Sequence, residues 1–392
     1  MSERKNAVGE QENPIFPEIL PVGQLNFPEW EEFEAMFRDI FKRKYYTNHG
    51  PLLQELEASL EAFLNVKHAI CVTNATLGLI MAAKALNIKG KVLVPGFTFI
   101  ATIQSLTWAG LEPIFCDVDP NTHLLTLDHI LPHMDEKPAA ILGVHLWGNS
   151  CHREDLNRFA QENKMALYYD AAHAFGCTHQ GIPIGNFGQL EVFSFHATKV
   201  LNAAEGGCIC TNDDEIAMRL RNMRSSYGAG PSIDIPLTGN ARMSEAQAAL
   251  ALLSLKEYPH IVQRNFQNYH CYKELLQDIP GIRLIPFAEN EKSNYQYVTL
   301  EISEKEFGIS RDDLVHRLEA QNIAARRYFY PGMHRTYPYN ETYSQYADKL
   351  PITDILSQRV AQLPSGKGIG ETEISKICHI IIQTRKKAWR AS

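Results

Sequence analysis

The sequence predicts an α/β fold in which helices cover both faces of a mainly parallel sheet, followed by a smaller C-terminal α+β domain. Between about residue 50 and residue 225, apolar strand-like runs alternate with helix-like runs, as in repeated βα units. After about residue 240 this alternation gives way to longer helices and a few strands. A chain of 392 residues can hold two joined domains, which we place at residues 15–250 and 251–392.

The elements of the first part follow from apolar spacing and from turn residues. Gly50 and Pro51 open the first expected helix, and Asn74 is suited to cap the helix that follows the first strand. The expected helices cover residues 52–63, 75–86, 99–108 and 153–163. The expected strands cover residues 69–72, 91–94, 113–116, 139–144 and 166–169, and two further apolar runs flank the segment between Ser194 and Gly206.

The second part has fewer and longer elements. We expect helices at 243–255, 262–277, 311–319 and 371–385, and strands at 295–302 and 323–326. Residues 366–370 read Gly-Lys-Gly-Ile-Gly, but no strand precedes them, so we interpret them as a turn and not as a phosphate loop.

Composition excludes several classes of function. The net charge of −7 argues against nucleic acid as the main partner. No apolar run approaches the roughly 20 residues that span a bilayer, and the polar first 14 residues are expected to form a disordered tail without a signal-peptide core. The eight cysteines are scattered without a CxxC pair, which indicates a reduced cytoplasmic protein. The fifteen histidines form no HxxxH or HxH pattern, so no metal site is expected.

The most informative residues are an acid and a lysine that follow two of the expected strands. Asp170 ends one strand, and Lys199 lies five residues after Ser194, which ends the next. A strand-end aspartate and a downstream lysine suggest a carbonyl cofactor, because the lysine can form a Schiff base while the acid holds a protonated ring nitrogen. At about 4 Å and an effective dielectric near 20, that attraction is about 4 kcal/mol, or roughly three pK units. An aspartate that only caps a turn is an equally good interpretation of Asp170 alone.

A phosphate site is suggested where the first strand turns into the helix capped by Asn74. The unpaired N–H groups of a helix N-terminus and its positive dipole end favour an anion there. Ala75 lets the backbone approach closely, and the hydroxyls of Thr76 and Ser194 can donate hydrogen bonds. The same residues would also suit a plain N-cap. His173, three residues after Asp170, can contact the cofactor ring or serve as a packed structural histidine.

The chain resembles the DegT/DnrJ/EryC1/StrS family of pyridoxal-phosphate (PLP) dependent aminotransferases of fold type I, which act on nucleotide-linked keto-sugars. The resemblance extends from Thr47 to about Pro364. The segments that carry it are residues 95–102 (PGFTFIAT), 117–120 (DVDP), 144–148 (VHLWG), 170–176 (DAAHAFG), 193–199 (FSFHATK), 205–207 (EGG) and 239–242 (GNAR).

The resemblance implies a role for each matching residue. Lys199 would bind PLP covalently, and Asp170 would hold its pyridine nitrogen. Ala75, Thr76 and Ser194 would bind the cofactor phosphate, Phe99 would stack on the ring, and Asn240 would reach the phosphate from the partner subunit of a homodimer with shared active sites. His334 matches a family segment near the sugar nucleotide. Apart from the resemblance, we also assign Arg327 to the substrate, as a cation for its phosphates.

Residues 173 and 199 bear on the substrate and on the type of reaction. His173 replaces the glutamine found in many members, which resembles a subgroup that makes 4-amino-4,6-dideoxy sugars on a thymidine diphosphate carrier. Lys199 argues against the related dehydratases, which have histidine there. We therefore expect transfer of an amino group from glutamate to dTDP-4-keto-6-deoxyglucose. The alternatives are a 3-keto-sugar nucleotide aminotransferase and a PLP-binding regulator without turnover, whereas a nicotinamide dehydrogenase would need a glycine fingerprint that the first βα turn lacks.

The substrate diphosphate requires local positive charge in a chain whose net charge is negative. Arginine binds phosphate through two hydrogen bonds, so one or two of five arginines are expected to serve the substrate. These candidates are Arg224, Arg242, Arg326, Arg327 and Arg335.

Overall fold

The computed structural model describes residues 13–226 and 238–391, and the side chains up to residue 388. Most of the predicted tail, residues 1–14, lies outside the described residues; Asn13 and Pro14 have no regular structure. Among the described residues, no helix combines the length and the apolar character that crossing a membrane requires.

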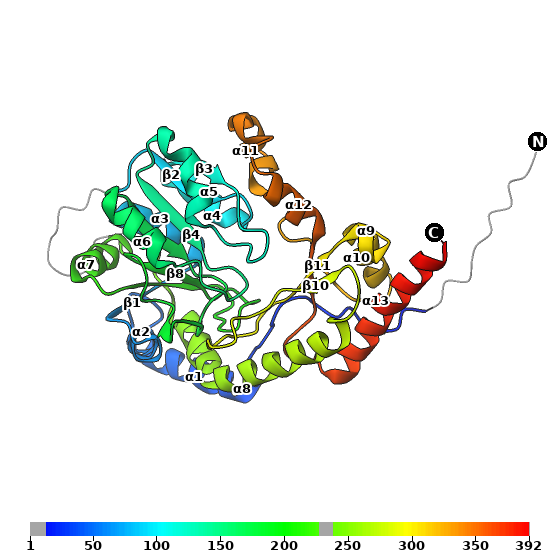
Figure 1. Cartoon of the computed structure of the whole chain (residues 1–392). Coiled ribbons are helices and arrows are strands. Elements are labelled where there is room, and N and C mark those ends of the chain that lie inside the picture. The colour runs from blue at the N-terminus through cyan, green and yellow to red at the C-terminus, as the bar shows by residue number, and fades with distance from the viewer. Residues whose placement is uncertain (1–12, 227–237, 392) are drawn as a thin grey trace, which may run out of the picture.

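A seven-stranded sheet forms the centre of the first part of the chain (Figure 1). Its strand order is β1-β9-β8-β5-β4-β2-β3, and only β9 runs against the others. The strands are β1 (His68–Val72), β2 (Lys91–Pro95), β3 (Glu112–Cys116), β4 (Ala140–Val144), β5 (Ala166–Asp170), β8 (Glu191–Ser194) and β9 (Gly207–Thr211). The predicted mainly parallel sheet is therefore confirmed, with one reversed strand next to β8.

The helices of this part lie close to their predicted positions. Asn74 caps α3 by accepting a hydrogen bond from the Leu77 backbone N–H at 2.9 Å, as its place in the sequence predicts. The helices are α1 (Trp30–Arg43), α2 (Pro51–Leu64), α3 (Ala75–Ala85), α4 (Ile100–Trp108), α5 (Leu127–Ile130), α6 (Glu154–Glu162) and α7 (Asp214–Met223), with a 3-10 helix η1 (Leu131–Glu136) and a small hairpin of β6 (Thr178–His179) and β7 (Ile182–Pro183).

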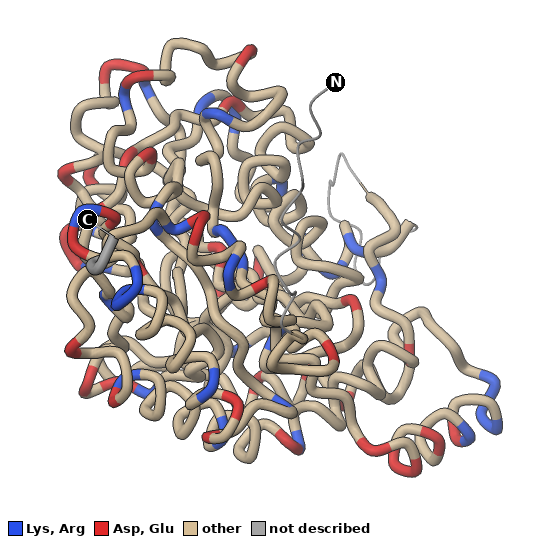
Figure 2. Tube along the Cα trace, turned by 90° about the vertical axis from the view of Figure 1, so that its right-hand side faces the viewer, with Lys and Arg blue, Asp and Glu red and all other residues tan. Residues whose placement is uncertain are grey.

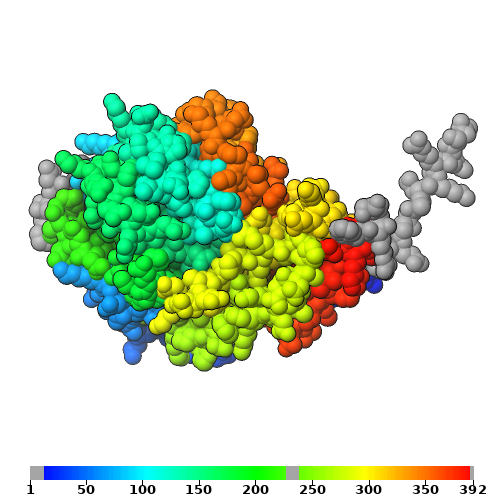
Figure 3. Space-filling model, viewed as in Figure 1, coloured from blue at the N-terminus to red at the C-terminus, as the bar shows by residue number. Residues whose placement is uncertain are grey.

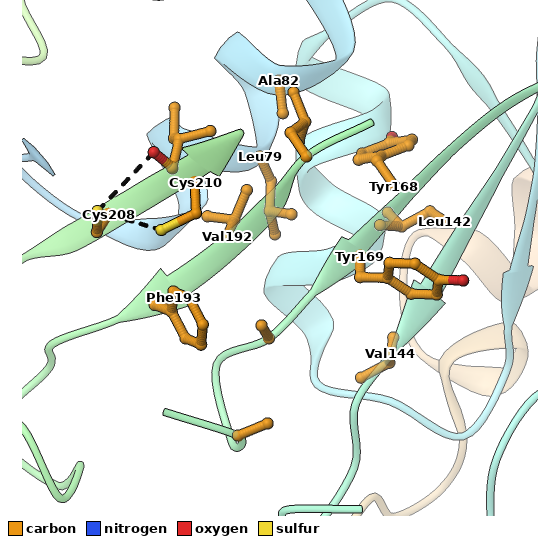
Figure 4. Close-up of a cluster of buried hydrophobic side chains, with 14 of the residues drawn as sticks. Leu79, Ala82, Leu142, Val144, Tyr168, Tyr169, Val192, Phe193, Cys208 and Cys210 are labelled. Carbon is orange, nitrogen blue, oxygen red and sulfur yellow. Dashed lines mark hydrogen bonds between the residues drawn. The ribbon is translucent and has the colours of Figure 1, made fainter. Parts of the chain in front are cut away.

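Both faces of the sheet are covered, and β8 shows how. Val192 and Phe193 are neighbours in the strand, so their side chains point to opposite faces (Figure 4). Val192 packs toward α3, where a Cβ on Gly78 would come within 2.8 Å of its methyl group. Phe193 meets Phe175 at 5.6 Å between ring centroids, and Phe175 in turn meets Tyr258. The sheet is thus buried on both sides, which explains its nearly continuous apolar strands.

The second part of the chain surrounds a three-stranded antiparallel sheet. Its order is β10 (Ile282–Leu284), β11 (Val298–Ile302), β12 (Val360–Leu363). The same part of the chain contains α8 (Glu245–Leu276), α9 (Glu304–Phe307), α10 (Arg311–Glu319), α11 (Tyr339–Thr342), α12 (Pro351–Arg359), α13 (Glu371–Ala391), η2 (Met333–Arg335) and η3 (Ser344–Tyr346). In Figure 3 the segment around α11 and α12 lies against the surface around α4 and β3 of the first part.

Two sequence predictions are wrong here. The helices expected at 243–255 and 262–277 are one helix, α8, which continues through Pro259. Proline removes one backbone donor, but a full capping box between Ser244 and Gln247 anchors the start of α8, and the helix packs against α1, α2 and α13 along its length. The strand expected at 323–326 is reduced to isolated bridges, from Ile323 to Leu20 and from Arg326 to Gln362.

The apolar core is divided into two clusters. The larger one surrounds the seven-stranded sheet, and the smaller one lies among β10, β11, β12, α10 and α13. Helix α8 contributes Tyr258 to the first cluster and Tyr272 to the second. Phe16, from the start of the described chain, belongs to the second cluster, so the division into 15–250 and 251–392 stays a prediction. Charges of both signs are interspersed over the trace (Figure 2).

Candidate active site

A cavity of about 630 Å³ opens at the carboxyl ends of β1, β4, β5 and β8, where open α/β sheets bind ligands. Seven of the ten predicted site residues line it: Ala75, Thr76, Phe99, Asp170, His173, Ser194 and Lys199. These residues come from four separate connections of the sheet. The parallel strands therefore bring together residues that lie up to 124 positions apart in the sequence.

Lys199 lies in the loop between β8 and β9, in surroundings that make its amine less basic. Its Nζ donates a hydrogen bond to the hydroxyl of Tyr297 at 2.7 Å. Burial lowers the pKa of Lys199 to about 8, the charge of Asp170 opposes this shift, and the charge of Arg326 adds to it. At pH 7 about one amine in ten with that pKa is neutral, compared with about one in three thousand for an ordinary lysine.

Asp170 ends β5 as a buried carboxylate that faces the cavity. Its Oδ2 accepts a hydrogen bond from the hydroxyl of Thr102 at 2.8 Å, and its Oδ1 accepts one from the backbone N–H of Ala172 at 3.0 Å. Burial raises the pKa of Asp170, although these two hydrogen bonds and the nearby charge of Lys199 act in the opposite direction. A cation placed against this carboxylate would offset part of its desolvation.

The N-terminus of α3 forms one wall of the cavity. Ala75 and Thr76 are its first two residues, and Ser194 comes from the end of β8 beside it. Gly207 on β9 permits the close approach, because a Cβ there would lie 2.8 Å from the Ala75 nitrogen and 2.9 Å from the Phe193 carbonyl oxygen. The result is a group of N–H and hydroxyl donors at the positive end of a helix dipole, which suits an anion.

Two ring-bearing side chains complete the cavity. Phe99 is 52% exposed although it is a large apolar residue, and it lines the cavity next to the start of α4. His173 is held between Trp147, at 5.6 Å between ring centroids, and Tyr297, at 4.3 Å. Burial lowers the pKa of His173 well below its usual value, and the positive charge of Lys199 acts in the same direction, so the ring is neutral at pH 7.

Three predicted site residues lie away from this cavity. Arg327 forms ion pairs with Asp312 at 2.8 Å and with Glu319 at 3.8 Å. His334 is buried beside Asp354, with 3.1 Å between its Nε2 and the carboxylate. Asn240 is exposed and does not line the cavity of its own chain. The substrate roles expected for Arg327 and His334 have no support in this geometry, and the role of Asn240 across a dimer stays a prediction.

Of the five candidate arginines, Arg326 alone lines the cavity. Arg224 is buried with Glu57, and Arg335 binds both carboxylate oxygens of Asp354. Arg242 donates to the hydroxyl of Ser225. Arg326 donates to the hydroxyl of Tyr328 at 3.0 Å, and within residues 13–226 and 238–391 no carboxylate forms an ion pair with it. It is therefore the arginine best placed to bind an anionic substrate.

The sequence reasoning missed two residues that contact the central pair. Thr102 lies in a segment that was matched to the family, but no role was predicted for it. Tyr297 lies 98 positions from Lys199, at the start of an ordinary alternating strand, so no local signal identifies it. Only the folded structure shows that Thr102 contacts Asp170 and that Tyr297 contacts Lys199.

The residues of the cavity fit PLP. Lys199 is an amine of lowered basicity, Asp170 is a buried carboxylate that lacks a full set of donors, and the start of α3 provides the hydroxyl and N–H groups that a phosphate requires. Phe99 offers an aromatic face in the same cavity. This chain therefore offers a partner for the pyridine nitrogen, for the aldehyde and for the phosphate.

Comparisons with known proteins agree with this assignment. A model of the DegT/DnrJ/EryC1/StrS aminotransferase family matches residues 29–382. The dTDP-4-amino-4,6-dideoxy-D-glucose transaminase of Shigella dysenteriae is 37% identical over 321 residues, which cover 82% of this chain and 86% of the relative. The Escherichia coli transaminase of the same name is 32% identical over 367 residues, or 93% and 98% of the two chains.

A solved structure shares the whole architecture. The crystal structure of DesI in the presence of its TDP-sugar product has a TM-score of 0.89 and 36% identity, and the match covers 96% of each chain. The family match, the relatives and the cofactor site point the same way: this chain belongs to the DegT/DnrJ/EryC1/StrS family of PLP-dependent aminotransferases.

Proposed function

We propose that this enzyme transfers an amino group from L-glutamate to C4 of dTDP-4-keto-6-deoxyglucose, giving the 4-amino-4,6-dideoxy sugar nucleotide. The observation that carries the proposal is the presence of Lys199 and Asp170 in one cavity with the N-terminus of α3. The two transaminases and DesI, which are at least 32% identical to this chain, support the choice of substrate.

The cofactor would be held at three points. Lys199 would bind it covalently, Asp170 would hold its ring nitrogen, and Ala75, Thr76 and Ser194 would hold its phosphate. Phe99 and His173 would contact the ring from the cavity walls. When bound, PLP supplies the electron sink for transamination.

Lys199 has the properties of the group that moves protons. Its neutral amine would take a proton from the substrate carbon that bears nitrogen. The pKa of about 8 makes this neutral form accessible near neutral pH. Asp170 is not suited to this role, because its carboxylate would be engaged with the ring nitrogen of the cofactor.

Arg326 would bind the anionic part of the substrates. Both the diphosphate of the sugar nucleotide and the carboxylates of glutamate need a cation, and Arg326 lines the cavity without a carboxylate partner among the described residues. The apolar side chains Leu79, Ile80 and Trp108 line the same cavity and could face the less polar parts of a deoxy sugar or a thymine base.

A homodimer with shared active sites is part of the proposal. Trp108 is 78% exposed and Phe99 is 52% exposed, and both line the cavity. Large aromatic side chains left open at a cavity suit coverage by a second copy of the chain, from which Asn240 would reach the cofactor phosphate.

A half-reaction with defined sugars tests the substrate. The enzyme in its pyridoxamine form is mixed with dTDP-4-keto-6-deoxyglucose, a 3-keto-6-deoxy isomer, or UDP- and GDP-linked 4-keto sugars. We expect the dTDP-4-keto sugar to restore the aldehyde absorbance fastest. A faster reaction with the 3-keto isomer, or with another carrier, would contradict this assignment, and no reaction with any of them would exclude the proposed transfer.

A further inference from the structure

The segment from Asn294 to Tyr297 connects the two loops that carry the central residues of the site. The Asn294 side chain donates hydrogen bonds to the carbonyl oxygens of His173 at 3.0 Å and Phe175 at 3.1 Å, in the turn after Asp170. Two residues on, Gln296 accepts a hydrogen bond from the Val200 backbone N–H at 2.9 Å, next to Lys199. One short segment thus fixes both loops relative to each other.

Tyr297 is the last residue of this segment and the one that contacts Lys199. The Lys199 Nζ donates to its hydroxyl oxygen at 2.7 Å and lies 5.4 Å from the centre of its ring. Tyr297 is 5% exposed, and its ring packs against His173 and Trp147, at 4.3 and 5.7 Å between centroids. The next residue, Val298, begins β11, so the phenol has little freedom to move.

We propose that Tyr297 is a positioning residue for catalysis, whose hydroxyl oxygen holds the Lys199 amine in place during the interval in which the lysine is free of the cofactor. In the structure the Lys199 amine lies on the Tyr297 hydroxyl oxygen, at 2.7 Å. The inference rests on the proposed role of Lys199 as the proton-transferring amine, and it adds the group that keeps this amine oriented.

The chemistry of the phenol supports this role. Burial raises the pKa of Tyr297 well above its usual value, so it stays a neutral hydroxyl whose oxygen can accept a hydrogen bond. The ionisable groups that act on Lys199 or on Tyr297 in the same place are Asp170, His173, Arg326 and Tyr328. A hydrogen bond from an ammonium group is stronger than one from a neutral amine, so the Tyr297 oxygen should favour the charged form of Lys199.

Replacement of Tyr297 by phenylalanine separates positioning from packing, because the ring remains. The test measures the rate at which the apoprotein binds PLP covalently as a function of pH, for the wild type, Tyr297→Phe and the control Tyr295→Phe. Tyr295 is a neighbouring tyrosine whose ring packs against Phe266 and Phe287, and it does not line the cavity.

The expected signature has two parts: more of the Lys199 amine is neutral at pH 7, and yet the half-reaction becomes slower. In Tyr297→Phe the midpoint of the pH profile falls by about one unit, because the lost hydrogen bond favoured the charged amine. The half-reaction with the amino donor nevertheless slows by roughly ten- to a hundredfold, with little change in KM, because the free amine is no longer held. Tyr295→Phe changes neither quantity.

The possible failures can be told apart. If the wild type binds no PLP at Lys199, the proposed function itself fails. If the wild type does bind it but Tyr297→Phe keeps the same midpoint and the same half-reaction rate, only the role of Tyr297 is refuted. A lower thermal midpoint of the Tyr297→Phe apoprotein, with an unchanged pH profile, would assign the residue to packing and overturn the proposal.

Discussion

Two buried carboxylates lie on neighbouring strands of the sheet, and their surroundings differ. Glu191, at the start of β8, accepts a hydrogen bond from His145 Nε2 at 2.6 Å and others from the backbone N–H groups of Gly185 and Phe187, the latter at 2.9 Å. Asp170, at the end of β5, has two donors and faces the cavity. A buried acid with a full set of donors holds the fold, whereas one left partly unpaired beside an amine is available for chemistry.

His145 extends this contrast, because its tautomer is fixed. Its Nδ1 accepts a hydrogen bond from the Cys151 backbone N–H at 2.8 Å, so its Nε2 carries the proton that it donates to Glu191. His145 and Glu191 form their hydrogen bonds with each other and with backbone groups of the protein. The hydrogen bonds of Asp170 and Lys199 leave room for a ligand.

The largest expected effect comes from removing the amine. Lys199→Ala should lower the transamination rate by at least about a thousandfold, since both the covalent attachment and the proton transfer are lost. Steady-state assays with glutamate and the keto-sugar nucleotide measure this. The control is Lys367→Ala, which removes an exposed lysine paired with Glu29 and should leave the rate unchanged. Retention of more than a tenth of the activity in Lys199→Ala would contradict the account.

Neutral replacement of Asp170 should lower the reaction rate, whereas neutral replacement of Glu191 should lower the stability of the fold. Asp170→Asn should lower the rate by roughly a thousandfold, the equivalent of about 4 kcal/mol of lost attraction to the ring nitrogen. Its apoprotein should be as stable as the wild type or more so at pH 7. Glu191→Gln should instead lower the free energy of unfolding by about 1–3 kcal/mol, because the new amide N–H₂ group would face the N–H of His145.

The pH dependence of stability gives a second test of the difference between Asp170 and Glu191. The pKa of Asp170 is raised in the folded state, so the folded state binds its proton more tightly than the unfolded state does. The wild-type apoprotein therefore loses stability relative to Asp170→Asn as the pH rises from below 4 toward neutral. Urea titrations of both proteins at pH 4 and pH 7 measure this difference. A wild type that gains stability relative to the variant over that range would show that the carboxylate is favourably paired, like Glu191.

The sequence alone predicts the site residues that lie at the end of a single strand or directly after it. Asp170, Ser194 and the start of α3 each follow from a local pattern, and the parallel sheet then brings them together. From the second part of the chain, Tyr297 contacts Lys199 and Arg326 lines the cavity. Arg326 lines it and Arg327 does not, because of the local backbone path. Residue spacing cannot distinguish two neighbouring arginines in a segment that forms only isolated bridges.

Long-range packing also decided the elements that were predicted wrongly. α8 continues through Pro259 because contacts at both of its ends outweigh the loss of one backbone hydrogen bond. The run at 323–326 pairs with two different segments, through Ile323 to Leu20 and through Arg326 to Gln362, and each pairing is a single bridge. His334 is enclosed with Asp354, and its expected substrate role stays a prediction.

A smaller effect is expected from pH on the uptake of the cofactor. With a pKa of about 8 for Lys199, the apoprotein should bind PLP about tenfold more slowly at pH 7 than on the plateau above pH 9. Stopped-flow absorbance at several pH values gives this profile. A midpoint near 10.5 would mean that Lys199 behaves as a solvated lysine and that burial does not tune it.

The smallest effect concerns the phosphate site at α3. Thr76→Val keeps the shape of the side chain and removes its hydroxyl, so the affinity for PLP should fall by roughly fivefold, the equivalent of about 1 kcal/mol. Equilibrium binding to the apoprotein measures it. Thr107→Val is the matched control, because its hydroxyl bonds to the Ile103 carbonyl within α4 and not to the cavity. Equal losses in both variants would remove Thr76 from the site.

The central claim is that one particular amine, that of Lys199, binds the aldehyde of the cofactor. Borohydride reduction of the holoenzyme, followed by proteolysis and mass spectrometry, reports the site of attachment directly. The account predicts a phosphopyridoxyl group on the peptide that contains Lys199. An unmodified Lys199, or a label confined to another lysine, would contradict it.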